Sequence, residues 1–432
     1  MRGIAIAAVF AGLASGCYQP GVADCLYQCN NGACPSGLSC VGGMCTSGTD
    51  CTAVPRDGGD DDGGGDARID GGAHAQCGDH MTYSMGEFCF HDAQSVQPGV
   101  GTMGLANPQF ADWDGDKLAD IVMLSGTSAR FWHGNGDGTW ATSPTSSTLS
   151  DSYTRFVASD FNGDGHEDFF CAGTSSYAIY AGQANAPPAF ASTVALGSTV
   201  VGMAVGHFTG SAAAPESGVA IAYQQALRVV PVNNALALQT AHAFAVNSPN
   251  RIYGVVPTLN GPLDHVSIAT VNTVQTLDAS SVAPSLVSMV PADAAPISFD
   301  AGDFDGDGLT DFVEVDTNGL ITVTYGKLAT GVHPTATGTV PGAHGGIAVG
   351  NFDGDPYEDF AVIAGVSATQ SDIYIFRGGP DVTQLVAVDP KPNGLGVTGD
   401  WIAAGDFNRD MIDDLVFMTQ STGAVAVLLS NP

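Results

Sequence analysis

Aspartates separated by glycines are the feature of this sequence most suggestive of chemistry. The stretch DFDGDGLTDF, residues 303–312, places Asp303, Asp305, Asp307 and Asp311 within nine residues. Carboxylates packed this closely repel one another unless a cation lies between them. Oxygen ligands are those that a hard cation such as Ca²⁺ prefers. The stretch therefore predicts a calcium loop.

The same loop recurs along the chain. Related segments begin at residues 112, 160, 207, 258, 303, 351 and 406, so that the repeats are spaced 45–55 residues apart. Five copies keep the acidic loop, whereas the copies at 206–222 and 257–269 have lost most of its acids. One such loop is weak evidence for a metal site. Five loops in register favour metal binding over solvated acidic turns.

Each intact loop is predicted to bind one ion through the side chains at positions 1, 3, 5 and 9 and the backbone carbonyl at position 7. The predicted side-chain ligands are Asp112, Asp114, Asp116, Asp120, Asp160, Asn162, Asp164, Asp168, Asp303, Asp305, Asp307, Asp311, Asn351, Asp353, Asp355, Asp359, Asp406, Asn408, Asp410 and Asp414. The predicted carbonyl ligands are those of Leu118, His166, Leu309, Tyr357 and Ile412. The sequence thus predicts about five structural Ca²⁺ sites.

An EF-hand is the main alternative for residues 303–314, because Glu314 falls at the twelfth position of that motif. The twelfth residues of the other intact loops are not ligands: Met123, Cys171, Val362 and Phe417. The residues after each loop alternate as in a strand, without the periodicity of a helix. We therefore expect a loop between two strands, with Glu314 as an exposed strand residue.

Short apolar runs surround every loop and predict the strands that position it. A run such as IAVG (347–350) precedes the loop, DFAVIAG (359–365) follows it, and DIYIF (372–376) closes the unit before a weaker fourth stretch. Four strands in 45–55 residues is the size of a propeller blade. The predicted fold is an all-β, seven-bladed β-propeller over residues 76–432. Because the last repeat ends after its third strand, residues 86–93 are predicted to supply the missing outer strand.

The DxDGDGxxD loops, the GNGDGTW turn at 134–140 and the seven-fold count resemble the FG-GAP/VCBS-repeat propellers of integrin α-subunits and many bacterial surface proteins. The resemblance covers about 80% of the chain. It implies adhesion or ligand recognition through loops on one propeller face. Calcium in such a protein is structural and rigidifies those loops.

The N-terminus has the features of a bacterial leader. Residues 1–16 carry one Arg and a short apolar run, which predicts a signal peptide. The following ASGC resembles a lipobox, which predicts lipidation of Cys17, although Ala14 stands where Leu is usual. The expected location is the bacterial cell envelope, as an outer-membrane or cell-surface lipoprotein. Ordinary cleavage after Gly16 would instead give a secreted protein.

The segment before the propeller divides into a cysteine-rich part and a part rich in Gly and Asp. Residues 17–55 hold six Cys between 25 and 51, which predicts a disulfide-stabilised segment of unknown pairing; without CxxC pairs or a nearby His, zinc is disfavoured. Residues 56–75 are rich in Gly and Asp and predict a flexible linker, since no nine-residue calcium repeat is present. Cys77 and Cys89 are predicted to form a disulfide, and Cys171 to be a buried free thiol.

The net charge and the absence of catalytic motifs argue against several classes of function. The net charge of −32, from 44 acids against 12 Lys and Arg, excludes a basic footprint for nucleic acid or anionic lipid. Contact with a membrane is expected only through the N-terminal anchor, and the chain is expected to be monomeric. The sequence contains no HExxH motif, no GxSxG motif and no pair of acids outside the loops that would indicate an enzyme.

We therefore predict a non-enzymatic, calcium-stabilised binding or adhesion module for an extracellular protein or glycan. The alternative is a calcium-dependent lectin or polysaccharide-binding protein, in which Trp132, Trp140 and Trp401 could stack on sugar rings. Ordinary blade packing is the competing explanation for these tryptophans, and we favour it for Trp401. A polysaccharide-active enzyme is the less favoured interpretation.

Overall fold

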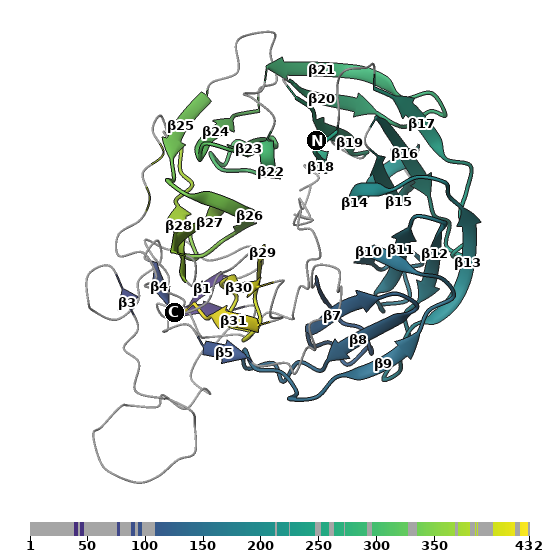
Figure 1. The fold of residues 1–432 in the computed structure, drawn as a ribbon, viewed down its shortest axis with the longest axis horizontal. Helices are drawn as coiled ribbons and strands as arrows, with labels where there is room; N and C mark the ends of the chain where they lie inside the picture. Colours follow the sequence, from purple (N-terminus) through teal and green to yellow (C-terminus); the bar gives the residue numbers. More distant parts are fainter. Residues whose placement is uncertain are drawn as a thin grey trace, which may run out of the picture.

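The computed structural model describes residues 39–41, 44–46, 76–77, 88–90, 94–96, 109–211, 214–223, 225–246, 252–258, 263–271, 273–291, 296–326, 335–367, 370–380, 385, 387, 401–419 and 424–430. Every regular element in this part of the chain is a β-strand. Seven small sheets stand around a common centre like the blades of a propeller (Figure 1). The described residues include no helix able to cross a membrane.

The first four blades each consist of four consecutive antiparallel strands, with the first strand innermost (Figure 1). Blade 1 comprises β6 (Gln109–Ala111), β7 (Asp120–Ser125), β8 (Ser128–Trp132) and β9 (Thr145–Thr148). Blade 2 comprises β10 (Tyr153–Ser159), β11 (Asp168–Gly173), β12 (Ser176–Ala181) and β13 (Ala189–Ala195). Blade 3 comprises β14 (Val200–Ser211), β15 (Ala214–Tyr223), β16 (Ala226–Pro231) and β17 (His242–Ala245). Blade 4 comprises β18 (Gly254–Thr258), β19 (His265–Ala269), β20 (Thr273–Asp278) and β21 (Ser285–Pro291).

The remaining blades follow the same order. Blade 5 comprises β22 (Pro296–Gly302), β23 (Asp311–Asp316), β24 (Leu320–Thr324) and β25 (Thr335–Thr339). Blade 6 comprises β26 (Ala343–Gly350), β27 (Asp359–Ser367) and β28 (Gln370–Phe376), with a bridge from Phe376 to Ala387 at its outer edge. Blade 7 comprises β29 (Trp401–Gly405), β30 (Asp414–Thr419), β31 (Ala424–Leu428) and, from the other end of the chain, β5 (Gln94–Val96).

An N-terminal strand closes the ring, as the sequence predicts. In β5, Val96 pairs with Val425 of β31, which supplies the missing outer strand of blade 7 (Figure 1). The strand is not at residues 86–93, however, but just after them. Phe88 and Phe90 are instead buried in the core between blades 6 and 7, and Phe90 bridges to Ser430. These apolar side chains draw the earlier segment onto the ring, so that the next residues form the edge.

Aromatic side chains at position 2 of the loops lock neighbouring blades together. Trp113 of blade 1 lies 4.4 Å from the ring of Phe169 in blade 2, and Phe407 of blade 7 lies 4.4 Å from Phe110 in blade 1. Phe208 is fully buried although its loop has lost the acids. Leu259, the corresponding residue of blade 4, lies outside the described residues. Packing at position 2 therefore does not depend on a metal.

Each intact acidic loop connects the first strand of a blade to the second, which confirms the loop between strands and excludes an EF-hand at residues 303–314. The prediction that Glu314 is exposed is wrong, because its side chain is buried in β23. The second strand of a blade has neighbouring blades on both of its faces, so even its alternate residues are covered. For the same reason Cys171 in β11 is a buried free thiol, as expected.

Several predictions concern the N-terminal region. Residues 1–16, Cys17, the linker at 56–75 and most of 17–55 lie outside the described residues. Within the Cys-rich segment, β1 (Ser39–Val41) and β2 (Met44–Thr46) pair as a hairpin. The backbones of Cys77 in β3 (Gln76–Cys77) and Cys89 in β4 (Cys89–Phe90) lie directly opposite each other. Their disulfide stays a prediction.

Candidate metal centre

A buried aspartate at position 9 holds each acidic loop in place. Its Oδ2 accepts the backbone N–H of position 2, and its Oδ1 accepts the N–H at the end of the third strand, at donor–acceptor distances of 2.6–3.1 Å. In blade 5, for example, Asp311 accepts from Phe304 at 2.8 Å and from Gly326 at 2.6 Å. Both carboxylate oxygens thus join three segments of one blade. The five aspartates with this role are Asp120, Asp168, Asp311, Asp359 and Asp414.

The carboxylates at positions 1, 3 and 5 accept hydrogen bonds from backbone N–H groups of their own loop. Asp112 accepts the N–H groups of Asp116 and Lys117, both at 2.9 Å. In all five loops the position-5 carboxylate accepts the N–H of position 7 at 2.8–2.9 Å. The backbone is left-handed at position 4 of all five loops and at position 6 of all but the blade-6 loop, where Pro356 stands. In blade 5, Gly306 and Gly308 provide this conformation at φ of 73° and 81°. This explains the DGDG spacing.

Two of the five loops gather three carboxylates around one point. Oxygen atoms of Asp112, Asp114 and Asp116 lie within 4.8 Å of one another, and so do those of one other triad, which lies in blade 5. That triad is Asp303, Asp305 and Asp311. Such acidic clusters can bind a metal ion, and their all-oxygen donors suit a hard divalent cation.

The other three intact loops do not gather three acids in this way. Each replaces one acid with an amide: Asn162, Asn351 or Asn408. An amide oxygen can still be a ligand, but it adds no negative charge. In blade 7, moreover, the hydroxyl of Ser430 lies 3.5 Å from the carbonyl of Ile412, a predicted carbonyl ligand. The five loops are therefore not equivalent.

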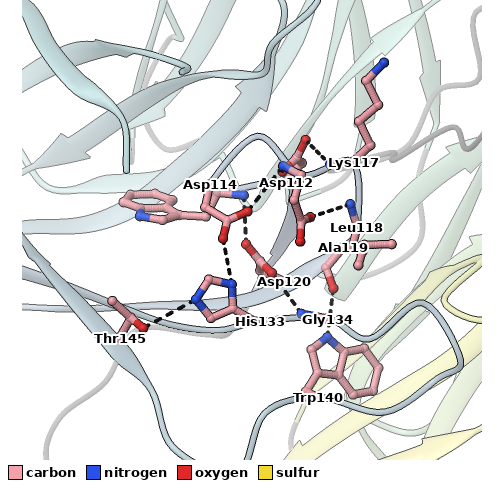
Figure 2. A network of polar contacts seen from close by, with 12 residues as sticks. Asp112, Asp114, Lys117, Leu118, Ala119, Asp120, His133, Gly134, Trp140 and Thr145 are labelled. Carbon is pink, nitrogen blue, oxygen red and sulfur yellow. Dashed lines mark hydrogen bonds and ion pairs between the residues drawn. The ribbon is translucent and has the colours of Figure 1, made fainter. Parts of the chain in front are cut away.

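His133 is a polar neighbour of the blade-1 loop that the sequence motif did not reveal. Its Nδ1 lies 2.6 Å from Oδ2 of Asp114, and it forms a group with Asp114 and Asp120 (Figure 2). It stands directly before Gly134, whose N–H binds Asp120. The residue directly before this glycine therefore lies beside the acidic loop. Aligning the repeats of this sequence with one another could have predicted that position.

Arg377 occupies the same place in blade 6, directly before Gly378. Its Nε lies 2.9 Å from Oδ2 of Asp353, a carboxylate with no exposed surface, and its guanidinium stacks on Phe88 at 4.8 Å from the ring centre. A positive charge of the protein itself thus neutralises the position-3 acid of this loop. The fit to a divalent cation is correspondingly poorer here than in blades 1 and 5.

Acids directly before the second strand link neighbouring blades. The side chains of Glu167, Glu358 and Asp413 each accept the backbone N–H of position 1 in the preceding blade, at 2.8, 2.6 and 2.8 Å. Asp264 does the same for His207 in blade 3 at 2.7 Å. The sequence analysis missed these residues. An acid one place before position 9 in three intact loops was the available signal.

Blade 3 shows what replaces a loop that has lost its acids. Here β14 and β15 continue as a hairpin in which Thr209 pairs with Glu216 and Ser211 with Ala214. Backbone ladder hydrogen bonds take the place of bonds to carboxylates. The propeller thus tolerates the loss of an acidic loop.

Burial of the loop acids raises the free-energy cost of ionising them in the metal-free chain. Desolvation raises the pKa of Asp120 and of Asp311 to about 8, although backbone N–H groups oppose the shift. The pKa of Asp168 rises to about 6 and that of Glu167 to about 7 for the same reason. Nearby carboxylates add to the shift at Asp120 and Asp311. A cation between the carboxylates would stabilise their ionised form.

The tryptophans considered as sugar platforms are mostly part of the core. Trp132 is fully buried and Trp140 nearly so, its Nε1 donating to the carbonyl of Ala119 at 2.8 Å (Figure 2). Trp401 is partly buried and stacks on Phe110 at 6.2 Å. Blade packing therefore explains all three.

The comparison with protein families gives a match in this region. Residues 112–171 match the family description "FG-GAP-like repeat". This stretch is similar to an FG-GAP-like repeat. It begins at the blade-1 loop and ends in β11, so it includes both of the first two acidic loops. The other blades repeat its strand order, and the whole is a seven-bladed propeller.

Solved structures support the fold alone. Two are crystal structures of BBS1N in complex with ARL6DN, one soaked with lead and one with mercury. The first has a TM-score of 0.55 at 12% identity and covers 79% of this chain and 97% of that chain. The second has a TM-score of 0.53 at 14% identity, with 79% and 96% covered. No curated protein matches the chain by sequence.

The position-9 bonds can be tested by replacing Asp311 with Asn. The amide nitrogen cannot accept one of the two backbone N–H groups, so we expect the free energy of unfolding of the metal-free protein to fall by about 1–3 kcal/mol. Asp307→Asn is the matched control, because this exposed side chain can keep its bond to Leu309 through the amide oxygen. Urea denaturation measures both. Equal losses from the two variants would contradict the assignment.

The raised pKa values predict how stability depends on pH. Asp120 and Asp311 have pKa values of about 8 in the folded protein against an ordinary value of 3.8, so the stability they contribute below pH 3.8 is lost as pH rises toward about 8. We expect metal-free protein, prepared on a chelating resin, to unfold more easily at pH about 8.5 than at about 6.5. Working above pH about 6.5 avoids His265, whose lowered pKa has the opposite effect. Saturating Ca²⁺ should flatten the dependence; an equal slope with and without Ca²⁺ would refute the link to the loops.

Proposed function

We propose that this protein is a calcium-stabilised β-propeller that acts at the bacterial cell surface as a non-enzymatic binding module. Its partner would be an extracellular protein or glycan. The observation that carries the proposal is the closed seven-bladed ring with acidic loops between its first and second strands. A closed ring of blades, which leaves only short outer edges, is a rigid support for connections on both of its faces.

Calcium is the ion that these loops suit best. Their donors are carboxylate, amide and carbonyl oxygens, and Ca²⁺ accepts many such ligands in flexible geometry. Blades 1 and 5 have the strongest case because three carboxylates converge in each. Blades 2 and 7 offer similar loops with one amide. In blade 6, Arg377 already neutralises Asp353, so we propose four occupied loops where the motif alone predicts five.

The acids of the loops support a structural role for the ion. Each position-9 carboxylate is fully buried and bonded to two backbone N–H groups of its own blade. A catalytic acid or base must instead reach a substrate proton. Shifted pKa values here follow from burial within the scaffold, which favours a binding module over an enzyme.

The proposed location rests on the N-terminal sequence. An apolar leader followed by ASGC supports export and a lipid anchor at Cys17, and the Gly/Asp-rich stretch 56–75 would separate the propeller from the membrane. The strongly acidic propeller, with 44 acids in the chain, would be repelled by anionic lipid surfaces. Both features favour display away from the bilayer.

Calcium binding can be tested by two matched substitutions at position 3. We expect Asp305→Ala to reduce the calcium stoichiometry measured by calorimetry by one, because this acid belongs to a converging triad and alanine offers no oxygen ligand in its place. Asp353→Ala should leave the stoichiometry unchanged, since Arg377 already pairs with Asp353 and the blade-6 loop is not among the proposed calcium sites. At about millimolar Ca²⁺ and a Kd near 10⁻⁴ M, each site should add about 1.4 kcal/mol to the unfolding free energy. A loss of one ion in both variants would show that Arg377 does not exclude calcium.

The binding role is tested by offering the full chain to arrays of glycans and of extracellular proteins. We expect saturable binding to one of the two classes in the presence of Ca²⁺. If calcium is structural, chelation should weaken binding only at temperatures where it also unfolds the propeller. Absence of saturable binding by protein shown to be folded would contradict the proposed function.

A further inference from the structure

A cavity of about 500 Å³ opens between blades 2 and 3. It is lined by residues 196–199, which connect β13 to β14, and by the turn from β15 to β16 with Tyr223, Gln225 and Arg228. Because neighbouring strands are antiparallel, the connections alternate between the two faces of the ring. Both of these connections lie on the face opposite the acidic loops. The cavity is thus separate from the candidate metal sites.

The charge at this cavity is the reverse of that of the whole chain. The protein has 44 acids against 12 Lys and Arg, yet none of the residues that line the cavity is acidic. Among the described residues, no carboxylate lies within ion-pair distance of Arg228. A guanidinium without an acidic partner in so acidic a chain is available to an anion from outside.

A buried tyrosine lies beside Arg228 at the same cavity. The Tyr223 side chain is 4% exposed, and its buried hydroxyl has Arg228 as its polar neighbour. The guanidinium carbon of Arg228 lies 5.6 Å from the centre of the Tyr223 ring. Burial raises the pKa of Tyr223 to about 12 against the opposing effect of Arg228, so the hydroxyl remains a donor at neutral pH. Tyr223 therefore holds the guanidinium of Arg228 in place at the cavity.

The rest of the lining suits a ligand rich in hydroxyl groups. Ser198, Thr199 and Gln225 are exposed and carry side chains that both donate and accept hydrogen bonds. The volume falls within the range of about 300–1,000 Å³ that is usual for small-ligand sites. An acidic peptide shares the carboxylate but lacks the ring of hydroxyls that these groups would meet.

We infer that this cavity binds an acidic saccharide, with Arg228, positioned by Tyr223, taking a uronic acid carboxylate and Ser198, Thr199 and Gln225 taking ring hydroxyls. The inference rests on the proposed function, since it names the ligand class of the binding module. It also assigns recognition to the face away from the calcium loops. Calcium would then affect the ligand only through the stability of the ring.

The test uses trigalacturonate as the probe and its methyl ester as an uncharged control. Calorimetry on the full chain, with Ca²⁺ and about 0.15 M salt to screen distant acids, measures both. We expect binding of trigalacturonate, at least about tenfold weaker binding of the ester, and a loss of at least about tenfold in Arg228→Ala. Tyr223→Phe removes only the hydroxyl and should weaken binding several-fold at an unchanged melting temperature.

Arg130→Ala is the matched control, since it removes the same charge from β8 of blade 1 and should leave binding unchanged. The inference is overturned if trigalacturonate does not bind, if the ester binds equally well, or if only an acidic peptide binds with the same dependence on Arg228. Binding of another glycan or protein that survives Arg228→Ala would overturn the inference while sustaining the proposed function. Absence of any ligand on the arrays would overturn both.

Discussion

The buried aspartate at position 9 is the group on which each acidic blade depends. Its two oxygens accept N–H groups from the start of the loop and from the end of the third strand, while its own backbone begins the second strand. One side chain therefore fixes the relative positions of three strands. The aromatic residue at position 2, whose N–H it holds, is directed onto the neighbouring blade. The residues at positions 2 and 9 thus combine the hydrogen bonds within a blade with the packing between blades.

This arrangement brings negative charge into the interior, and the protein compensates for it in different ways. Backbone N–H groups surround every loop and stabilise the ionised carboxylates in part. Blade 6 adds Arg377 and blade 1 adds His133, whereas blade 3 replaces its acids with a hairpin. Blades 1 and 5 keep converging acids, for which a divalent cation is the natural partner. The blades of one ring thus differ in how the charge of their acids is compensated. This explains how a loop can lose its acids while the fold is kept.

The two faces of the propeller are chemically distinct. The acidic loops and the 134–140 turn lie on one face, where Gly138 donates to the carbonyl of Phe407 and joins blade 1 to blade 7. The cavity with Arg228 lies on the other face. Because alternate connections of antiparallel strands face opposite ways, the chain can elaborate one set without disturbing the other. The connections on one face can therefore change without altering those on the other.

The sequence by itself determined the repeat, the seven blades and the loops between strands, because a strand pattern and a DxDGDG turn are local features. It also placed the closing strand within a few residues, since a ring with a missing edge strand must take one from the other chain end. Only the tertiary structure decided which loops gather three acids, and that His133, Arg377 and Glu167 lie beside loops from which they are distant in sequence. It also decided that Glu314 and Trp132 are buried, because the second and third strands of a blade are covered by neighbours that no local pattern specifies. The Arg228 guanidinium without an acidic partner became visible for the same reason: only the packing of blade 2 against blade 3 shows which groups find a partner and which do not.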